Sequence, residues 1–405
     1  MADAGELAGG TLSEVRSALI WDPAFIGYRF RPDHPFNPKR LELTVSLIEA
    51  LGLDDGPGVQ RVAPRTATDE ELLLVHSPEY IAAVKRFSEP GADTSDAGEW
   101  GLGTDDTPVF PGMHAVTSLV VGATLRAAEL VMSGEVTRAL NPAGGLHHAH
   151  RDRASGFCVY SDLAVAIAWM RKEHNARVLY VDYDAHHGDG VQGIFYDDPE
   201  VLTLSIHESG RYLFPGTGFV DELGEGEGYG YSLNVPLEPF TEDDSWIGIY
   251  AKLLPEVAEA FRPDVIVLQN GCDGHAYDPL THLRATTRLY EETVRITCEV
   301  ADRVCGGRVV ATGGGGYAVW KTVPRAWTLV WAGLSGQHAP NRLPREWTDH
   351  WQGESPDLLA DELRDPAGLI PAVPRRAEIE ATNARTLESL RRQALPLLRG
   401  WGLAF

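Results

Sequence analysis

The sequence has few cysteines, and none forms a recognisable metal or redox motif. The four, Cys158, Cys272, Cys298 and Cys305, stand apart and include no C-x-x-C pair. A thiolate metal site or a dithiol redox centre is therefore not expected. Free thiols of this kind fit a reducing compartment such as the cytoplasm.

Long apolar segments are also missing. No run of about 18 apolar residues occurs, so we expect no membrane-spanning segment. The stretch Met1–Gly10 has neither the basic region nor the apolar region of a secretory signal. The sequence therefore predicts a cytoplasmic protein with no membrane partner.

Positive charge is scarce as well. The chain has 35 Lys and Arg residues against 58 Asp and Glu residues, which gives a formal net charge of −23. Nucleic-acid binding depends on basic side chains that neutralise phosphates, so we expect no nucleic-acid partner. A cationic partner suits this charge better than an anionic one.

The chain contains short apolar runs that alternate with stretches of helical length. Its 405 residues are 43% hydrophobic and 23% charged, which is typical of a globular protein. The predicted strands are Ala18–Trp21, Thr137–Leu140, Val178–Val181, Val201–Ile206, Val265–Leu268 and Val309–Ala311. The predicted helices are Ala115–Met132, Leu163–Glu173, Asp243–Ala260, Leu283–Val304 and Ala377–Leu398, the last capped by Gly400. This alternation predicts a doubly wound α/β fold with a mostly parallel sheet flanked by helices.

Polar residues follow four of the predicted strands directly. The segments are Asn141–His148, Asp182–Asp189, Gln269–Asp273 and Gly313–Tyr317. Sites in doubly wound sheets gather at the carboxyl ends of the strands. We therefore expect these four segments to form one shared site.

Asp184 and His186 are the strongest metal-binding residues in the sequence. Residues two apart in a strand face the same side, so both could reach one ion, with Asp182 one step deeper. Asp273 would supply a third ligand. Three protein ligands and an open position are typical of catalytic zinc, and this donor set also suits iron. The alternative is a solvated turn, but unpaired acids beside an apolar strand would be costly.

Two further groups could act beside such a metal. His147 and His148 are adjacent, so their side chains point in different directions, and Asp182 and Asp189 are available to fix a ring nitrogen. Tyr317 follows four glycines and could donate to an oxyanion. Taken alone, the histidines could be packing residues and the glycines a tight turn.

Seven motifs make the sequence resemble the zinc-dependent histone deacetylase superfamily, especially the bacterial acetoin-utilisation deacetylases and the class I eukaryotic enzymes. They are HPFNPKR (34–40), DTPVF (106–110), NPAGGLHHAHRDRASGFC (141–158), VDYDAHHGDGVQ (181–192), FPGTG (214–218), QNGCD (269–273) and GGGGY (313–317). The resemblance implies the arginase/deacetylase fold in a single domain over 1–405. Its motif-bearing core would cover about 19–336, with a C-terminal helical extension over about 340–405.

The resemblance also implies roles for individual residues. The zinc ligands would be Asp184, His186 and Asp273, with ferrous iron as the alternative metal. The catalytic residues would be His147 paired with Asp182, His148 paired with Asp189, and Tyr317. The substrate-binding residues would be Asp106 at the rim and Gly156, Phe157, Phe214 and Leu280 in an acyl-lysine tunnel, with Arg40 in an internal acetate channel.

Two potassium sites are implied in the same way. A structural potassium ion would be bound by Asp182, Asp184, His186, Ser205 and Ile206. A second monovalent ion would be bound by Phe195, Asp198, Val201 and Tyr231.

The implied activity is hydrolysis of acetyl-lysine in proteins, with acetyl-CoA synthetase as a family-level substrate. An acetylpolyamine deacetylase would use the same catalytic residues, but the short segment Lys85–Asp105 favours an open rim. A dinuclear arginase-type enzyme would need an acid at Gly188, whereas the next acid is Asp189. A non-catalytic regulator would have lost a ligand or the tyrosine, and none is lost. The sequence does not indicate the oligomeric state.

Overall fold

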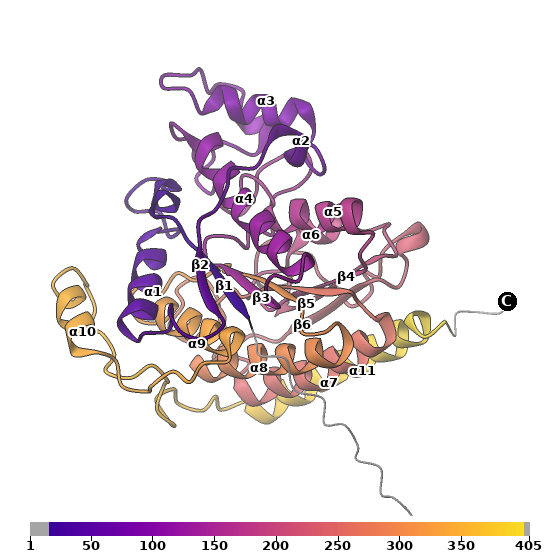
Figure 1. The fold of residues 1–405 in the computed structure, drawn as a ribbon. Coiled ribbons are helices and arrows are strands. Elements are labelled where there is room, and N and C mark those ends of the chain that lie inside the picture. The colour runs from indigo at the N-terminus through magenta and orange to yellow at the C-terminus, as the bar shows by residue number, and fades with distance from the viewer. Residues whose placement is uncertain (1–15, 401–405) are drawn as a thin grey trace, which may run out of the picture.

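The computed structural model describes residues 16–400, whose centre is one sheet of eight parallel strands (Figure 1). The strand order is β2-β1-β3-β8-β7-β4-β5-β6, and every neighbouring pair is parallel. The strands are β1 (Ser17–Ile20), β2 (Val59–Val62), β3 (Arg138–Asn141), β4 (Val178–Asp182), β5 (Val201–Glu208), β6 (Ser232–Leu237), β7 (Val265–Gln269) and β8 (Val309–Thr312). The six strands β1, β3, β4, β5, β7 and β8 are buried at every position, because helices cover both faces of the sheet.

Figure 1 shows the helices in two layers around this sheet. The α-helices are α1 (Lys39–Ala50), α2 (Asp69–Leu72), α3 (Pro78–Phe87), α4 (Met113–Met132), α5 (Asp162–His174), α6 (Asp189–Ile194), α7 (Asp243–Phe261), α8 (Thr287–Val304), α9 (Val323–Ser335), α10 (Arg345–Gln352) and α11 (Arg376–Leu398). Short 3₁₀ helices are η1 (Pro23–Gly27), η2 (Ala97–Trp100) and η3 (Gly226–Gly228). Helices α4 and α5 pack together on one face, whereas α7, α8 and α9 pack in a row on the other. The predicted doubly wound fold is confirmed, and the sheet is entirely parallel in the described residues.

The predicted elements agree with the structure except at a few boundaries. The predicted helix from Leu283 was too long, since α8 begins at Thr287. The backbone N–H of Arg284 donates to Thr241 O and that of Ala285 to Gly274 O, so this segment is held against loops. Strands β2 and β6 were missed because they are the sheet edges and lack a continuous apolar run.

Helix α4 is the one described helix that is long and apolar enough to cross a membrane. In its apolar 18-residue window 67% of the residues are buried. It packs against α5 and β3. These contacts are those of a core helix in an α/β domain.

The C-terminal segment packs along the rest of the domain. Helix α10 contacts α1, and α11 lies against α7 and the edge strand β6. Helix α11 matches the predicted Ala377–Leu398 within one residue, and Gly400 follows it with the left-handed φ of 69° that suits a C-terminal cap. The limits proposed for the motif-bearing core and the extension remain predictions. The predicted domain also includes residues 1–15 and 401–405, which lie outside the described residues.

Candidate functional site

The four polar segments predicted to meet follow four adjacent strands. Strands β3, β8, β7 and β4 are consecutive in the sheet, and each ends at the same edge because all are parallel. The segments after these strands carry the histidine pair, the glycine run, Asp273 and Asp184, respectively. Sheet order therefore brings together residues that lie up to 176 positions apart, from Asn141 to Tyr317.

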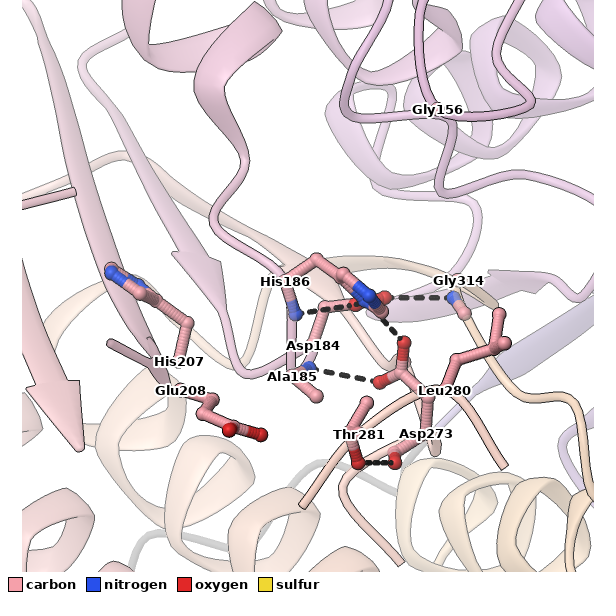
Figure 2. Close-up of polar contacts among 12 residues, drawn as sticks. Gly156, Asp184, Ala185, His186, His207, Glu208, Asp273, Leu280, Thr281 and Gly314 are labelled. Carbon is pink, nitrogen blue, oxygen red and sulfur yellow. Dashed lines mark hydrogen bonds and ion pairs between the residues drawn. The ribbon is translucent and has the colours of Figure 1, made fainter. Parts of the chain in front are cut away.

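Asp184, His186 and Asp273 form a buried cluster with the geometry of a metal site (Figure 2). One ligand atom from each lies within 4.8 Å of the other two. His186 Nδ1 is 2.8 Å from Asp273 Oδ2 and 3.3 Å from Asp184 Oδ1. Two carboxylates and one imidazole are a donor set that divalent zinc or iron accepts.

The second oxygen of each carboxylate is held by the protein. Asp184 Oδ2 accepts hydrogen bonds from Gln269 Nε2 at 2.8 Å and from the Gly315 backbone N–H at 2.7 Å. Asp273 Oδ1 accepts from the Ala185 N–H at 2.8 Å. These bonds leave the other oxygens directed at His186 Nδ1, so the donor atoms are preorganised for an ion.

The two buried carboxylates of this cluster repel each other, which favours a bound cation. Burial raises the pKa of Asp273 to about 6, and the nearby charge of Asp184 raises it as well. A bound divalent cation would relieve this repulsion between the two carboxylates. Space is tight, since a Cβ at Gly315 would lie 2.1 Å from Asp273 Oδ2. Glycine at this position lets the backbone approach the carboxylates.

The reason given for the convergence of Asp184 and His186 was wrong. Strand β4 ends at Asp182, so both residues lie in the loop that follows and not on one face of a strand. The loop is shaped by local hydrogen bonds: the Asp184 N–H donates to Asp182 Oδ1 and the His186 N–H to Asp184 Oδ1, each at 3.0 Å. The spacing of two still brings the residues together, because each carboxylate accepts a hydrogen bond from the backbone N–H two residues later, which forms two consecutive Asx-turns.

The histidine pair lies beside the cluster with both predicted carboxylates in contact. His147 Nδ1 is 2.8 Å from Asp182 Oδ2, and His148 Nδ1 is 2.7 Å from Asp189 Oδ1. The two rings are 4.1 Å apart between centroids. The second Asp189 oxygen lies 3.3 Å from His150 Nε2, a contact that the sequence did not indicate.

The two histidines have opposite pKa shifts. Burial acts to lower the pKa of His147, but the charges of Asp182 and Asp184 outweigh it and raise the pKa to about 9. For His148, burial and the positive charge of His147 lower the pKa to about 4. A proton acceptor and a proton donor thus stand side by side.

A cavity of about 450 Å³ leads from the surface to these residues. All five predicted substrate residues line it, as do His148, His186 and Tyr317; the five are Asp106, Gly156, Phe157, Phe214 and Leu280. The Phe157 ring packs edge-on against Tyr317 at 5.7 Å, and the Phe214 ring against His148 at 5.0 Å. The lining of the cavity also includes the exposed Arg31 and the buried His34, which the sequence analysis did not assign to the site.

Tyr317 is held by a residue that the sequence analysis missed. The Tyr317 backbone N–H donates to Asp278 Oδ2 at 2.7 Å, and Asp278 Oδ1 accepts from Leu280 N–H at 3.0 Å. One carboxylate thus holds both the tyrosine and a wall of the cavity. Asp278 lies in a loop without a recognisable motif, so no pattern in one sequence would have revealed it.

Arg40 lies behind the glycine run and is almost fully buried. Its Nη1 donates to Gly314 O at 2.9 Å and to Gly316 O at 3.1 Å, and burial lowers its pKa. Its Nε has no hydrogen-bond partner in the described structure. A buried guanidinium with a free donor suits an anion, as the predicted acetate channel requires, and that role remains a prediction.

Of the residues predicted for the first potassium ion, Asp182, Ser205 and Ile206 lie on the adjacent strands β4 and β5, whereas Asp184 and His186 lie in the loop after β4. Register pairs Asp182 on β4 with Ser205 on β5, and Ser205 Oγ is 2.8 Å from His207 Nδ1. For the second ion, the N–H of Asp198 donates to Phe195 O and that of Val201 to Asp198 O, while Tyr231 O accepts from Thr203 N–H. Both sites remain predictions.

Comparison with known proteins gives consistent matches. Residues 34–334 match the family model of the histone deacetylase domain. The chain is 52% identical over 372 residues to the acetoin utilization protein AcuC of Bacillus subtilis, covering 92% of this chain and 95% of that protein. It is 42% identical over 371 residues to AcuC of Staphylococcus aureus, covering 91% and 95%.

Solved structures show the same similarity. The crystal structure of a histone deacetylase homologue from Aquifex aeolicus matches with a TM-score of 0.82 and 35% identity, covering 92% of this chain and all of that one. A structure of a histone deacetylase homologue complexed with SAHA matches with a TM-score of 0.80 and 34% identity, covering 93% of this chain and all of that one.

Proposed function

This chain belongs to the histone deacetylase family and is a deacetylase, and from that premise we propose that it removes acetyl groups from lysine side chains of proteins and releases acetate. The observation that carries the proposal is the cavity between Phe157 and Phe214, which ends at His148, His186 and Tyr317. The apolar side chains of Phe157, Phe214 and Leu280 in its lining suit the long methylene chain of lysine, and the polar acetamide would then lie beside the polar groups of the same cavity.

The family uses a divalent metal, and we propose zinc bound by Asp184, His186 and Asp273. Ferrous iron accepts the same donors and is the alternative. Bound there, the metal would polarise the acetyl carbonyl and lower the pKa of a water molecule. Potassium bound beside Asp182 and Ser205 would stabilise the loop that carries these ligands.

We assign the proton acceptor to His148. It lines the cavity, whereas His147 lies behind it with Nε2 3.9 Å from Asp184 Oδ1. Asp189 on Nδ1 of His148 orients the ring, so that Nε2 is free to take a proton from the attacking water. A protonated histidine of the pair then donates a proton to the leaving lysine amine.

Tyr317 would donate its hydroxyl proton in a hydrogen bond to the oxyanion of the tetrahedral intermediate. Burial raises the pKa of this phenol well above its usual value, so it stays protonated and able to donate. Its ring is supported by Phe157, and its backbone by Asp278. Asp106, exposed at the mouth of the cavity, would accept hydrogen bonds from the substrate backbone.

A deacetylation panel tests this proposal. We expect hydrolysis of acetyl-lysine peptides, loss of activity with a chelator, and recovery with zinc or ferrous iron. Acetylated polyamines serve as the comparison, and acetylated acetyl-CoA synthetase as a protein substrate. Hydrolysis of polyamines alone would reject the protein substrate while keeping the deacetylase activity. Cell fractionation tests the proposed cytoplasmic location.

A further inference from the structure

We call the cavity of about 450 Å³ that contains His148, His186 and Tyr317 the tunnel. A second cavity, of about 650 Å³, lies on the surface next to the loops that line the tunnel. We call it the apolar groove, and its main apolar walls are Tyr212, Phe240, Pro371, Val373, Pro374 and Ile379. We propose that it binds apolar side chains of the substrate polypeptide next to the acetylated lysine. This inference rests on the proposed function and adds to it a preference for substrate sequence.

The groove adjoins the tunnel through two separate segments of chain. In the first, Tyr212 lines the groove while its neighbours Leu213 and Phe214 line the tunnel. In the second, Leu280 lines the tunnel and Arg284 lines the groove. A polypeptide with its acetyl-lysine in the tunnel would therefore reach the groove within a few residues, at about 3.3 Å per extended residue.

Phe240 has an unusual backbone for a groove residue. Its φ is 65°, in the left-handed region that disfavours non-glycine residues, and the residue is 48% exposed. Four described non-glycine residues have positive φ. Asn175 and Arg262 are helix C-caps, and the fourth is Phe157 of the tunnel wall. The tunnel and the groove thus each contain a phenylalanine with a strained backbone, Phe157 and Phe240, and such strain is typical of binding surfaces.

The groove is held in shape by polar contacts to neighbouring segments. The Phe240 N–H donates to His282 O at 3.0 Å. His282 N–H and Nδ1 contact the buried Glu208 carboxylate at 2.8 and 2.7 Å, and Figure 2 shows this carboxylate pointing toward the loop with Leu280 and Thr281. On the other side, the Glu238 N–H donates to Asn383 Oδ1 on α11 at 2.9 Å. A preformed groove loses little entropy on binding, so its apolar contacts count toward affinity.

The chemistry of the walls defines the occupant. Tyr212 and Phe240 are 54% and 48% exposed as residues, and they lie beside prolines and aliphatic residues. Covering such an exposed apolar patch with apolar side chains of a ligand removes it from water, which favours binding. Leucine, valine or phenylalanine side chains on an extended segment would fill it, whereas serine would not.

The test compares short and extended substrates on the full-length, metal-loaded enzyme. The short substrate is acetyl-lysine with both ends blocked. The extended peptides carry four apolar residues on the N-terminal or C-terminal side, and matched peptides carry serine there. We expect kcat/KM for one apolar peptide to exceed that of its serine counterpart about tenfold, through KM.

Variants then locate the effect. Phe240→Gly removes the ring at a backbone angle that glycine adopts readily, and Ile379→Ser removes a second wall. In both, the ratio of kcat/KM between apolar and serine peptides should fall toward one. The control is Leu358→Ser, an 84% exposed leucine outside the groove, which should keep the ratio of the unaltered enzyme.

The outcomes separate the two proposals. Hydrolysis of acetyl-lysine peptides with no preference for apolar flanks would overturn the groove and keep the proposed function. Hydrolysis of acetylpolyamines alone would overturn both. Analytical sedimentation of the enzyme and of Phe240→Gly tests whether the groove binds a second copy of the chain instead. If the enzyme is a dimer and the variant is a monomer, the groove is a dimer interface, and the substrate assignment is overturned.

Discussion

Asp365 and Arg325 form a buried ion pair, with 2.7 Å between Oδ1 and Nη1 and side chains that are 1% and 4% exposed. The other oxygen, Asp365 Oδ2, lies 2.8 Å from His275 Nε2 and accepts from the Thr287 N–H at 2.9 Å. One carboxylate therefore joins α9, the start of α8 and the loop after Asp273. Asp365 lies beyond residues 34–334, so the C-terminal segment completes the core of the domain.

Replacing Asp365 should destabilise the protein strongly. Asp365→Ala leaves the guanidinium of Arg325 buried without its charged partner, with only the Nε donation to Lys321 O remaining, and such losses cost about 3–5 kcal/mol in the free energy of unfolding. Denaturant titration measures the change. Asp357→Ala is the control, because its pair with Lys321 is 42% and 39% exposed and is worth about 0–1 kcal/mol. Equal effects of the two substitutions would contradict the buried role.

His76 should make the stability depend on pH. Burial lowers the pKa of this histidine to about 4 and outweighs its backbone hydrogen bonds, which favour the charged ring. In the neutral ring Nδ1 donates to His150 O and Nε2 accepts from the Ser161 N–H. The unfolded chain binds that proton near pH 6.5, so stability is complete above this pH and is lost as pH falls toward 4.

The difference in pKa corresponds to a loss of about 3 kcal/mol between these pH values. Denaturant titrations at several pH values give the free energy of unfolding as a function of pH. Between pH 6.5 and pH 4 this free energy should fall less steeply for His76→Gln than for the unaltered protein. Parallel curves would show that His76 does not cause the loss.

Tyr317→Phe should reduce turnover without affecting the metal. Loss of one oxyanion donor typically lowers kcat about 100- to 1,000-fold. The ring remains to pack against Phe157, so metal content and thermal stability should be unchanged. Steady-state kinetics and elemental analysis provide the two measurements. Unchanged kcat would remove Tyr317 from the mechanism.

Asp273→Ala should remove the metal together with the activity. Two remaining ligands do not form the three-ligand site of catalytic zinc. Elemental analysis after dialysis should find about one metal ion per chain in the unaltered protein and almost none in the variant. Asp106→Ala, at the exposed rim, should retain the metal. If Asp273→Ala retained one metal ion per chain, the proposed set of metal ligands would be wrong.

Much of the fold could be predicted from the sequence because its signals are local. Apolar runs such as Val178–Val181 and Val265–Leu268 identify central strands, since both faces of such strands are buried. The edge strand β2 gave no signal, because a partly exposed strand needs no continuous apolar run.

The sequence alone determined which residues stand at the strand ends, from Asn141 to Tyr317, and which family motifs they form. Only the tertiary structure decided how they meet. The order β3-β8-β7-β4 makes neighbours of strands that are distant in the chain. Asp278, Asp365 and the apolar groove appear only in the structure, because their partners come from separate segments. Such contacts depend on long-range packing, and no local pattern in the sequence encodes them.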